Sequence, residues 1–289
     1  LMGGTVEVES EYGSGSSFVV VIPQECRNST PVGKLDMTSF LAGRTEYKYQ
    51  SRFIAPEARI LVVDDVEINL KVFVNLVKQL KMQIDTATGG EESIELACKN
   101  KYDIIFMDHM MPGLNGIETL VELQKRKENK NIDTPIIMLT ANALSGMKEM
   151  YLENGFTDYL SKPIDGVKLE KQIEKYLPQK KVRVIREEQR ESEKKEDIHK
   201  NHAENPTEIL DCLQNSIPEL KRKEALEYCA GSEAFYVECL KEFCQNCRKE
   251  SIQQLFSSSN WVEYAVQVHG LKSTSKTLGF ALLGNLAEQ

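Results

Sequence analysis

Five side chains that are suited to phosphoryl chemistry stand at the ends of short apolar segments. The acidic pair Asp64-Asp65 follows one such segment, and Asp108 closes another. Thr140 ends a third segment, and Lys162 comes directly after a fourth. Carboxylates at close range repel one another, by on the order of 4 kcal/mol for a pair about 4 Å apart at an effective dielectric near 20. We therefore expect either a proton on one carboxylate or a hard cation among the three.

The type of ligand indicates which cation such a site would hold. Oxygen ligands favour Mg²⁺, which keeps several waters and leaves room for phosphate oxygens. In that setting Asp108 can act as a nucleophile towards a phosphoryl group, and the metal, the Lys162 ammonium and the Thr140 hydroxyl would share the charge on its oxygens. Each residue alone is better explained as a helix cap, a turn residue or a solvated side chain. Their joint placement predicts a site.

The elements that must position these side chains alternate between strand and helix. Short apolar strands are expected of a parallel sheet that is covered on both faces. Five strand–helix units predict a doubly wound α/β domain with the flavodoxin-like strand order 2-1-3-4-5. That order places strands 1 and 3 side by side and gathers the five side chains at the carboxyl edge of the sheet. The predicted helices cover residues 67–80, 90–100, 116–130, 143–154 and 165–177.

Residues 59–178 resemble the receiver domain of two-component response regulators. The segments that carry the resemblance are Ile60-Leu61-Val62-Val63-Asp64-Asp65, Asp108-His109-Met110-Met111-Pro112-Gly113-Leu114-Asn115-Gly116, Thr140-Ala141-Asn142-Ala143 and Tyr159-Leu160-Ser161-Lys162-Pro163. The resemblance implies that Asp108 is the phosphoacceptor. It implies that Asp64, Asp65 and the Met110 backbone carbonyl hold Mg²⁺ together with Asp108.

The same resemblance assigns roles to the residues at the later strand ends. Thr140 and Lys162 would contact the phosphate. The Lys162-Pro163 peptide bond would be cis, and Tyr159 would be the aromatic residue whose rotamer reports activation. A receiver domain over residues 58–178 follows from these assignments.

A second phosphoryl acceptor is predicted at His269. Lys272 lies three residues further along and Ser273 four, so both share the helix face of His269. An exposed imidazole with nearby cations can accept a phosphoryl group, although a lone histidine at a core boundary would be the simpler explanation. The segment Val268–Gly279 resembles the histidine phosphotransfer domain, whose motif is His-x-Leu-Lys-Gly. Ser273 stands where that family usually has glycine.

Residues 207–289 are helical by pattern and predict an all-α domain, an incomplete four-helix bundle. Pro218 suits an early helix position, and Gly231-Ser232 indicates a helix end followed by a new N-cap. A further helix is expected to start near Asn260-Trp261. Its apolar stripe would consist of Trp261, Ala265, Val268, Leu271, Leu278 and Leu282. The family's bundle would need another helix after about residue 289, so we predict a truncated phosphotransfer domain.

Three further segments complete the organisation of the chain. Residues 1–24 predict a strand pair and resemble the closing hairpin of the histidine-kinase ATPase domain. Residues 25–57 and the highly charged residues 179–206 are predicted to be linkers. The ATP-binding motifs of that family would lie upstream, so the chain would be part of a histidine kinase without its ATP-binding core.

The overall composition excludes some classes of function. A net charge of −8 and a pI near 5.3 argue against a nucleic-acid surface. No stretch reaches the roughly 18 apolar residues of a membrane span, and seven irregularly spaced cysteines are typical of a reduced protein. We expect a cytoplasmic location and no membrane contact for these residues, whether or not the full-length protein is anchored in a membrane.

Together these features predict the C-terminal part of a hybrid sensor histidine kinase that works in a phosphorelay. Asp108 would receive a phosphoryl group from a kinase histidine of the same full-length protein or its dimer mate. It would exchange that group with His269, which would serve the receiver of a downstream response regulator. The alternatives are a Mg²⁺-dependent phosphatase with an aspartate nucleophile, a DNA-binding regulator, and an interaction module without relay.

Overall fold

The computed structural model describes residues 4–11, 15–23, 51–141, 147–184, 205–246 and 249–287. The chain divides into two compact units, Leu1–Glu46 and Tyr47–Gln289. In the first unit β1 (Thr5–Glu11) pairs antiparallel with β2 (Gly15–Val21), so that Thr5 lies opposite Val21. The predicted strand pair is therefore present, and its turn at residues 12–14 lies outside the described residues.

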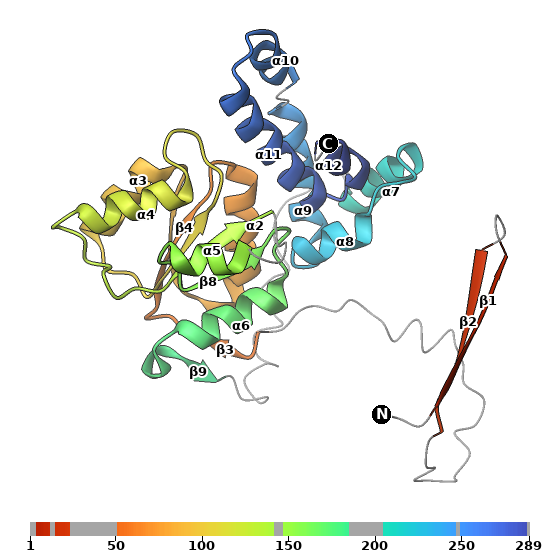
Figure 1. Cartoon of the computed structure of the whole chain (residues 1–289), viewed down its shortest axis with the longest axis horizontal. Coiled ribbons are helices and arrows are strands. Elements are labelled where there is room, and N and C mark those ends of the chain that lie inside the picture. Colours follow the sequence, from red (N-terminus) through yellow and green to blue (C-terminus); the bar gives the residue numbers. More distant parts are fainter. Residues whose placement is uncertain are drawn as a thin grey trace. The chain divides into compact units, whose positions relative to one another are not determined.

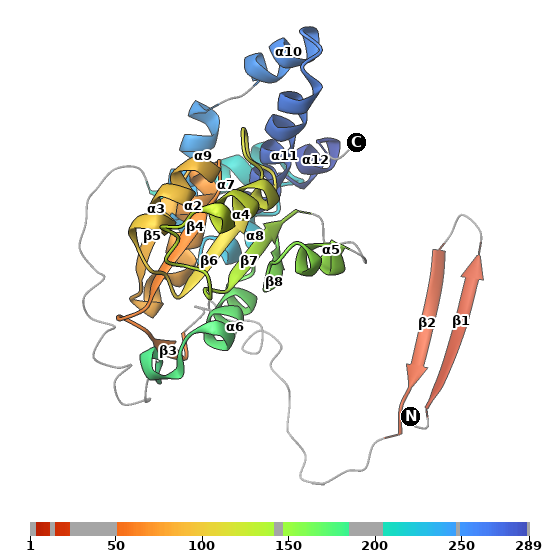
Figure 2. The same cartoon turned by 60° about the vertical axis from the view of Figure 1, so that its left-hand side comes forward.

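The second unit contains a parallel five-stranded sheet with the order β5-β4-β6-β7-β8 (Figures 1 and 2). This order is the predicted 2-1-3-4-5, and the fold class is confirmed. The first and third strands of this sheet are neighbours, with Ile60 opposite Ile104. The strands are β4 (Arg59–Val63), β5 (Gln83–Ala87), β6 (Ile104–Asp108), β7 (Ile136–Thr140) and β8 (Asp158–Ser161).

Helices cover both faces of the sheet because alternate strand residues point in opposite directions. Ile60 and Val62 belong to one buried cluster, with α2 and α6, whereas Leu61 and Val63 belong to the other, with α3, α4 and α5. The helical elements are α2 (Glu67–Val77), η1 (Lys78–Leu80), α3 (Gly90–Lys99), α4 (Gly116–Lys125), α5 (Met147–Glu153) and α6 (Gly166–Tyr176). These bounds agree with the predicted helices except at α4 and α5.

Helix α4 ends five residues before the predicted end at residue 130. The following loop is held by Asn131, whose side chain accepts a hydrogen bond from the Tyr102 backbone N–H at 2.8 Å and donates one to the Ala97 carbonyl at 2.7 Å. A buried asparagine that bonds two neighbouring segments stabilises the loop in place of another helical turn. At α5 the predicted start, residue 143, lies outside the described residues.

The sheet domain is longer than predicted at both ends. Strand β3 (Phe53–Ile54) pairs antiparallel with β9 (Arg183–Val184), which follows the short helix η2 (Gln179–Lys181). Phe53 is only 1% exposed, and Lys181 forms an ion pair with Asp103 at 2.8 Å. Residues 51–57 and 179–184, which we predicted to be linker, therefore pack on the sheet domain.

The C-terminal region is helical, as predicted, and α10 and α11 form a hairpin (Figures 1 and 2). Ser232 and Asn260 are N-caps, at the two predicted helix starts. Pro218 lies instead in the turn between α7 and α8, and the proline at a helix start is Pro206. The helices are α7 (Pro206–Ser216), α8 (Arg222–Tyr228), α9 (Glu233–Gln245), α10 (Lys249–Ser257), α11 (Trp261–Thr277) and α12 (Ala281–Leu286).

Three of the six members of the apolar stripe predicted for this region are exposed, namely Trp261, Ala265 and Leu282. Trp261 and Leu282 are 54% and 65% exposed, although Leu278 is buried. The buried residues of α11 are small and mostly polar: Gly270, Ser273, Thr274, Ser275 and Thr277. Two of the hydroxyls bond within the helix, from Thr274 to the Gly270 carbonyl at 2.9 Å and from Thr277 to the Ser273 carbonyl at 3.0 Å. Small side chains such as these permit close helix packing, which a search for apolar residues misses.

Among the helices of the described residues, none has the length and apolar character needed to cross a bilayer.

Candidate functional site

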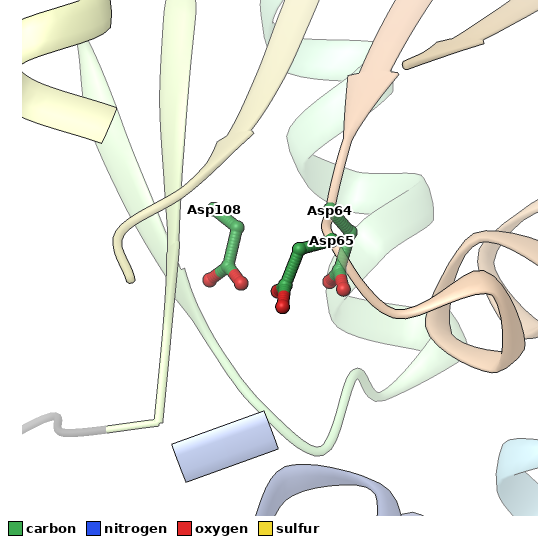
Figure 3. A group of neighbouring side chains, drawn as sticks. All are labelled: Asp64, Asp65 and Asp108. Carbon is green, nitrogen blue, oxygen red and sulfur yellow. The ribbon is translucent and has the colours of Figure 1, made fainter. Parts of the chain in front are cut away.

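Two neighbouring strands bring three carboxylates together at the carboxyl edge of the sheet. Asp108 is the last residue of β6, and Asp64 and Asp65 follow β4 directly. One ligand atom from each of the three carboxylates lies within 4.8 Å of the others (Figure 3). Asp64 and Asp108 are each 1% exposed, and Asp65 is half-buried. The predicted juxtaposition of the first and third strand ends is therefore present.

Lys162 supplies a positive charge to this acidic cluster. Its Nζ lies 2.6 Å from Asp64 Oδ2 and 2.8 Å from Asp108 Oδ1. The lysine follows β8, and the peptide bond to Pro163 is cis, as the receiver resemblance implied. One buried ammonium thus contacts two buried carboxylates of the cluster.

Burial and charge together control the protonation of these groups. Burial raises the pKa of Asp108; the ammonium of Lys162 lowers it and the charge of Asp64 raises it again. Burial lowers the pKa of Lys162, but attraction to Asp108 and Asp64 outweighs this effect and its pKa is raised overall. The cluster holds more negative than positive charge in a largely buried site, so a further cation would stabilise its ionised form. Three carboxylates so close together suit Mg²⁺.

Local hydrogen bonds fix the orientation of two of the carboxylates. Asp64 Oδ1 accepts hydrogen bonds from the Val66 backbone N–H and from Asn69 Nδ2, both at 3.0 Å. Asp108 Oδ1 accepts a hydrogen bond from the His109 backbone N–H at 2.8 Å. Asn69 was not among the predicted site residues, although its position in the first turn of α2, five residues after Asp64, could have indicated the contact.

Thr140 lies at the end of β7 and is 1% exposed. The hydroxyl of Tyr151 donates a hydrogen bond to Thr140 Oγ1 at 3.0 Å. The same hydroxyl lies 3.4 Å from His109 Nδ1. Tyr151 was not among the predicted site residues. Met110, whose carbonyl we expected to be a metal ligand, lies in the turn two residues after Asp108.

The helical region packs against α2 of the sheet domain. Lys71 Nζ forms an ion pair with Glu242 Oε2 at 2.6 Å, and Asn75 Nδ2 donates a hydrogen bond to the Cys229 carbonyl at 3.1 Å. Apolar side chains of both regions belong to one buried cluster, which includes Val72 and Leu76 from α2 and Leu240 from α9. The two regions were predicted to be separate domains, and this packing between them was not expected.

His269 of α11 lies within electrostatic range of the acidic site. Burial lowers its pKa to about 4, the charges of Lys162, Lys272 and His109 lower it too, and Asp64 opposes them. Its Nε2 is buried and has no hydrogen-bond partner in the part of the chain that the structure describes. The imidazole is therefore neutral at pH 7, and Lys272 shares its helix. The structure thus places the two predicted phosphoacceptors, Asp108 and His269, at the same end of the sheet domain.

The family model of the response regulator receiver domain matches residues 60–174. Curated relatives include the aerobic respiration control sensor protein ArcB of Escherichia coli strain K12, 29% identical over 175 residues. They also include the autoinducer 2 sensor kinase/phosphatase LuxQ of Vibrio parahaemolyticus, 30% identical over 164 residues. The matched parts cover 61% and 57% of this chain but 21% and 18% of those relatives, so the chain spans about a fifth of their length.

Known structures similar to this chain include a receiver domain of a Pseudomonas aeruginosa sensor histidine kinase, which has a magnesium ion coordinated in its active-site cleft. It is 31% identical, with a TM-score of 0.37, and the match covers 42% of this chain and 96% of that one. A receiver domain of a Francisella response regulator is 32% identical, with a TM-score of 0.38, and the match covers 42% of this chain and 96% of that one.

Proposed function

Residues 60–174 are a response regulator receiver domain, and from this premise we propose that the chain relays phosphoryl groups between Asp108 and His269. The observation that carries the proposal is the acidic cluster at the sheet edge, with Lys162 bonded to two of its carboxylates. The position of His269 within electrostatic range of the same cluster supports the second half of the relay.

In the first step Asp108 acts as the nucleophile. A carboxylate oxygen of Asp108 forms a bond to phosphorus while the bond from phosphorus to the donor's imidazole nitrogen breaks, and the electron pair of that bond stays on the nitrogen. Lys162 and Thr140 stabilise the charge on the phosphoryl oxygens. Asp64, Asp65, Asp108 and the Met110 carbonyl would hold Mg²⁺, which when bound neutralises charge on the carboxylates and on the phosphoryl oxygens.

In the second step His269 accepts the group. Its imidazole is neutral because its pKa is low, so a ring nitrogen has a lone pair for attack. The new nitrogen–phosphorus bond forms as the bond from phosphorus to the Asp108 oxygen breaks, and the electron pair returns to the carboxylate. Lys272, on the same helix, would offset charge on the transferred group. The same atoms serve transfer in the opposite direction.

The proposed partners follow from this chemistry. The donor is a histidine of a kinase domain, in the same full-length protein or its dimer mate, and the acceptor of the His269 phosphoryl group is the receiver of a separate response regulator. The N-terminal strand pair fits the closing hairpin of a kinase ATPase domain. We therefore assign the chain to the cytoplasmic, C-terminal part of a hybrid histidine kinase, with residues 207–289 as its phosphotransfer domain.

The residue two places after Asp108 argues against the alternative phosphatase. An aspartate-nucleophile phosphatase normally has a second carboxylate there as acid and base, and this chain has Met110. A receiver that serves only as an interaction module would not need the buried contacts of Lys162 with Asp64 and Asp108.

Phosphorylation of the intact chain tests the proposal. The chain is incubated with Mg²⁺ and acetyl phosphate, and the added mass and its stability to acid and base are followed on wild type, Asp108→Asn and His269→Gln. We expect a base-labile label that requires Asp108, followed by an acid-labile label that requires both residues. Label that persists in Asp108→Asn would contradict the proposal, and rapid release of free phosphate would favour the phosphatase.

A further inference from the structure

We infer that Tyr151 is a positioning residue for Thr140 and thereby controls how fast Asp108 takes up a phosphoryl group. This inference rests on the proposed function, because it concerns the step in which Asp108 is phosphorylated. Neither the receiver resemblance nor the sequence pattern assigned a role to this tyrosine, which lies in α5 rather than at a strand end.

The surroundings of Tyr151 hold its side chain in one place. The residue is 0% exposed, and its ring meets the rings of His109 and Phe156 edge-on, with centroids 5.4 Å and 6.4 Å apart. Packed on two sides by aromatic rings, the phenol cannot swing away without opening the core. Its hydroxyl is therefore a fixed group beside the end of β7.

The hydrogen bond from Tyr151 restricts the orientation of the Thr140 hydroxyl. Tyr151 donates to Thr140 Oγ1 at 3.0 Å, so that oxygen acts as an acceptor in this contact. A threonine hydroxyl has only one proton of its own, and that proton must then point to a different acceptor. Leu139 pairs with Asp108 across the sheet, so Thr140 stands next to the strand end that carries the phosphoacceptor. A phosphoryl oxygen bound to Asp108 would therefore be an acceptor for the Thr140 proton.

Tyr151 is protonated at neutral pH and can therefore donate. Burial raises the pKa of the phenol and so does the negative charge of Asp108, while the hydrogen bond with Thr140 lowers it. The net pKa is raised, so Tyr151 keeps its proton at neutral pH. Hydrogen bonds linked in a chain strengthen one another, so a proton donated to Thr140 makes the threonine hydroxyl a better donor to the phosphoryl group.

Removal of one hydroxyl tests the inference without emptying the core. In Tyr151→Phe the ring remains and only the donor to Thr140 is lost. We expect the maximal rate of Asp108 phosphorylation by acetyl phosphate, at saturating Mg²⁺, to fall about five-fold, the worth of one hydrogen bond. The half-saturating donor concentration should stay unchanged, because the lost contact acts on the reacting group rather than on donor binding.

Tyr102→Phe is the matched control. Tyr102 is also buried, at 1% exposed, and its hydroxyl donates to Asp85 Oδ2 at 2.6 Å, away from the acidic cluster. This variant loses a buried tyrosine hydrogen bond but keeps the Tyr151–Thr140 contact. We expect a lower unfolding midpoint and a wild-type phosphorylation rate.

A double-mutant cycle distinguishes positioning from a purely structural role. If Tyr151 acts through Thr140, then Tyr151→Phe should have no further effect on the rate in a Thr140→Val background, and it should keep its effect in a Thr140→Ser background. The same five-fold loss in the valine background would overturn the inference, as would a wild-type rate in Tyr151→Phe alone. A wild-type chain that takes no label on Asp108 would instead refute the proposed function on which the inference rests.

Discussion

Replacement of Lys162 by methionine tests the electrostatics of the acidic site most directly. Methionine keeps much of the volume of the lysine side chain and removes its charge, so Asp64 and Asp108 remain buried without their cation. At separations of 2.6 and 2.8 Å, each ion pair has a Coulomb attraction of about 6 kcal/mol at an effective dielectric near 20. Desolvation offsets part of this attraction, and removal of one partner from a buried ion pair typically costs about 3–5 kcal/mol. We expect a loss of that size in the free energy of unfolding at pH 8 without Mg²⁺.

The pH dependence of the loss has a definite sign. Burial already raises the pKa of Asp108 in the folded chain, and loss of Lys162 removes the positive charge that lowers it. A carboxyl group whose folded pKa lies above its unfolded pKa binds more protons when folded, so its contribution to stability is present at low pH and is lost as pH rises through the folded pKa. The variant should therefore be more stable at pH 5 than at pH 8, by a larger margin than wild type.

Mg²⁺ should rescue the variant, since a divalent cation replaces the missing charge. Ligand at about 100 times its Kd adds about 2.7 kcal/mol to the free energy of unfolding. The measurement is urea unfolding at pH 5 and pH 8, with and without Mg²⁺. Lys175→Met is the control, because Lys175 is 59% exposed in its ion pair with Asp158 and its loss should cost at most about 1 kcal/mol. Equal destabilisation of the two variants would refute the reasoning, and so would a Mg²⁺ effect no larger on Lys162→Met than on wild type.

Three other perturbations have expected outcomes. In Gly116→Ala the new Cβ would lie 2.3 Å from the Asp108 carbonyl oxygen. We expect the free energy of unfolding in urea to fall by about 1–3 kcal/mol and phosphorylation of Asp108 to slow. An unchanged urea midpoint would contradict this expectation. Lys71→Glu replaces the 2.6 Å ion pair with Glu242 by a repulsion, so transfer of label from Asp108 to His269 should slow a few-fold while labelling of Asp108 stays the same. Adding Glu242→Lys should restore the transfer rate, and failure to do so would show that this contact does not guide docking. The pKa of His269 is lowered from 6.5 to about 4, so unfolded chains bind more protons between these values and wild type should lose stability as pH falls through this window. His269→Gln should lose less over the same range, and parallel pH profiles of the two proteins would argue that the imidazole is not buried in solution.

The acidic site was predictable from the sequence because strand ends follow a general rule of topology. Asp64 and Asp108 close apolar segments, and the strand order of a doubly wound sheet makes their strands neighbours. Lys162 could be placed at the same edge on the same grounds. These predictions required only the positions of residues along their own strands.

Tyr151 was not predictable in this way because its partners are set by packing. Tyr151 reaches Thr140 from a helix on one face of the sheet, and no spacing in the sequence marks that contact. Helix α11 illustrates a second limit, since it buries small hydroxyl residues such as Ser273 and Thr274 and leaves Trp261 largely exposed. The apolar residues of that helix therefore indicated the wrong face.

The pairing of β3 with β9 also determines how the receiver is joined to the rest of the chain. Phe53 lies opposite Val184, so the polypeptide enters and leaves this domain through two adjacent strands. Because its two ends lie next to each other, the domain can be excised, or exchanged for another of its kind, with both cuts at one place on its surface.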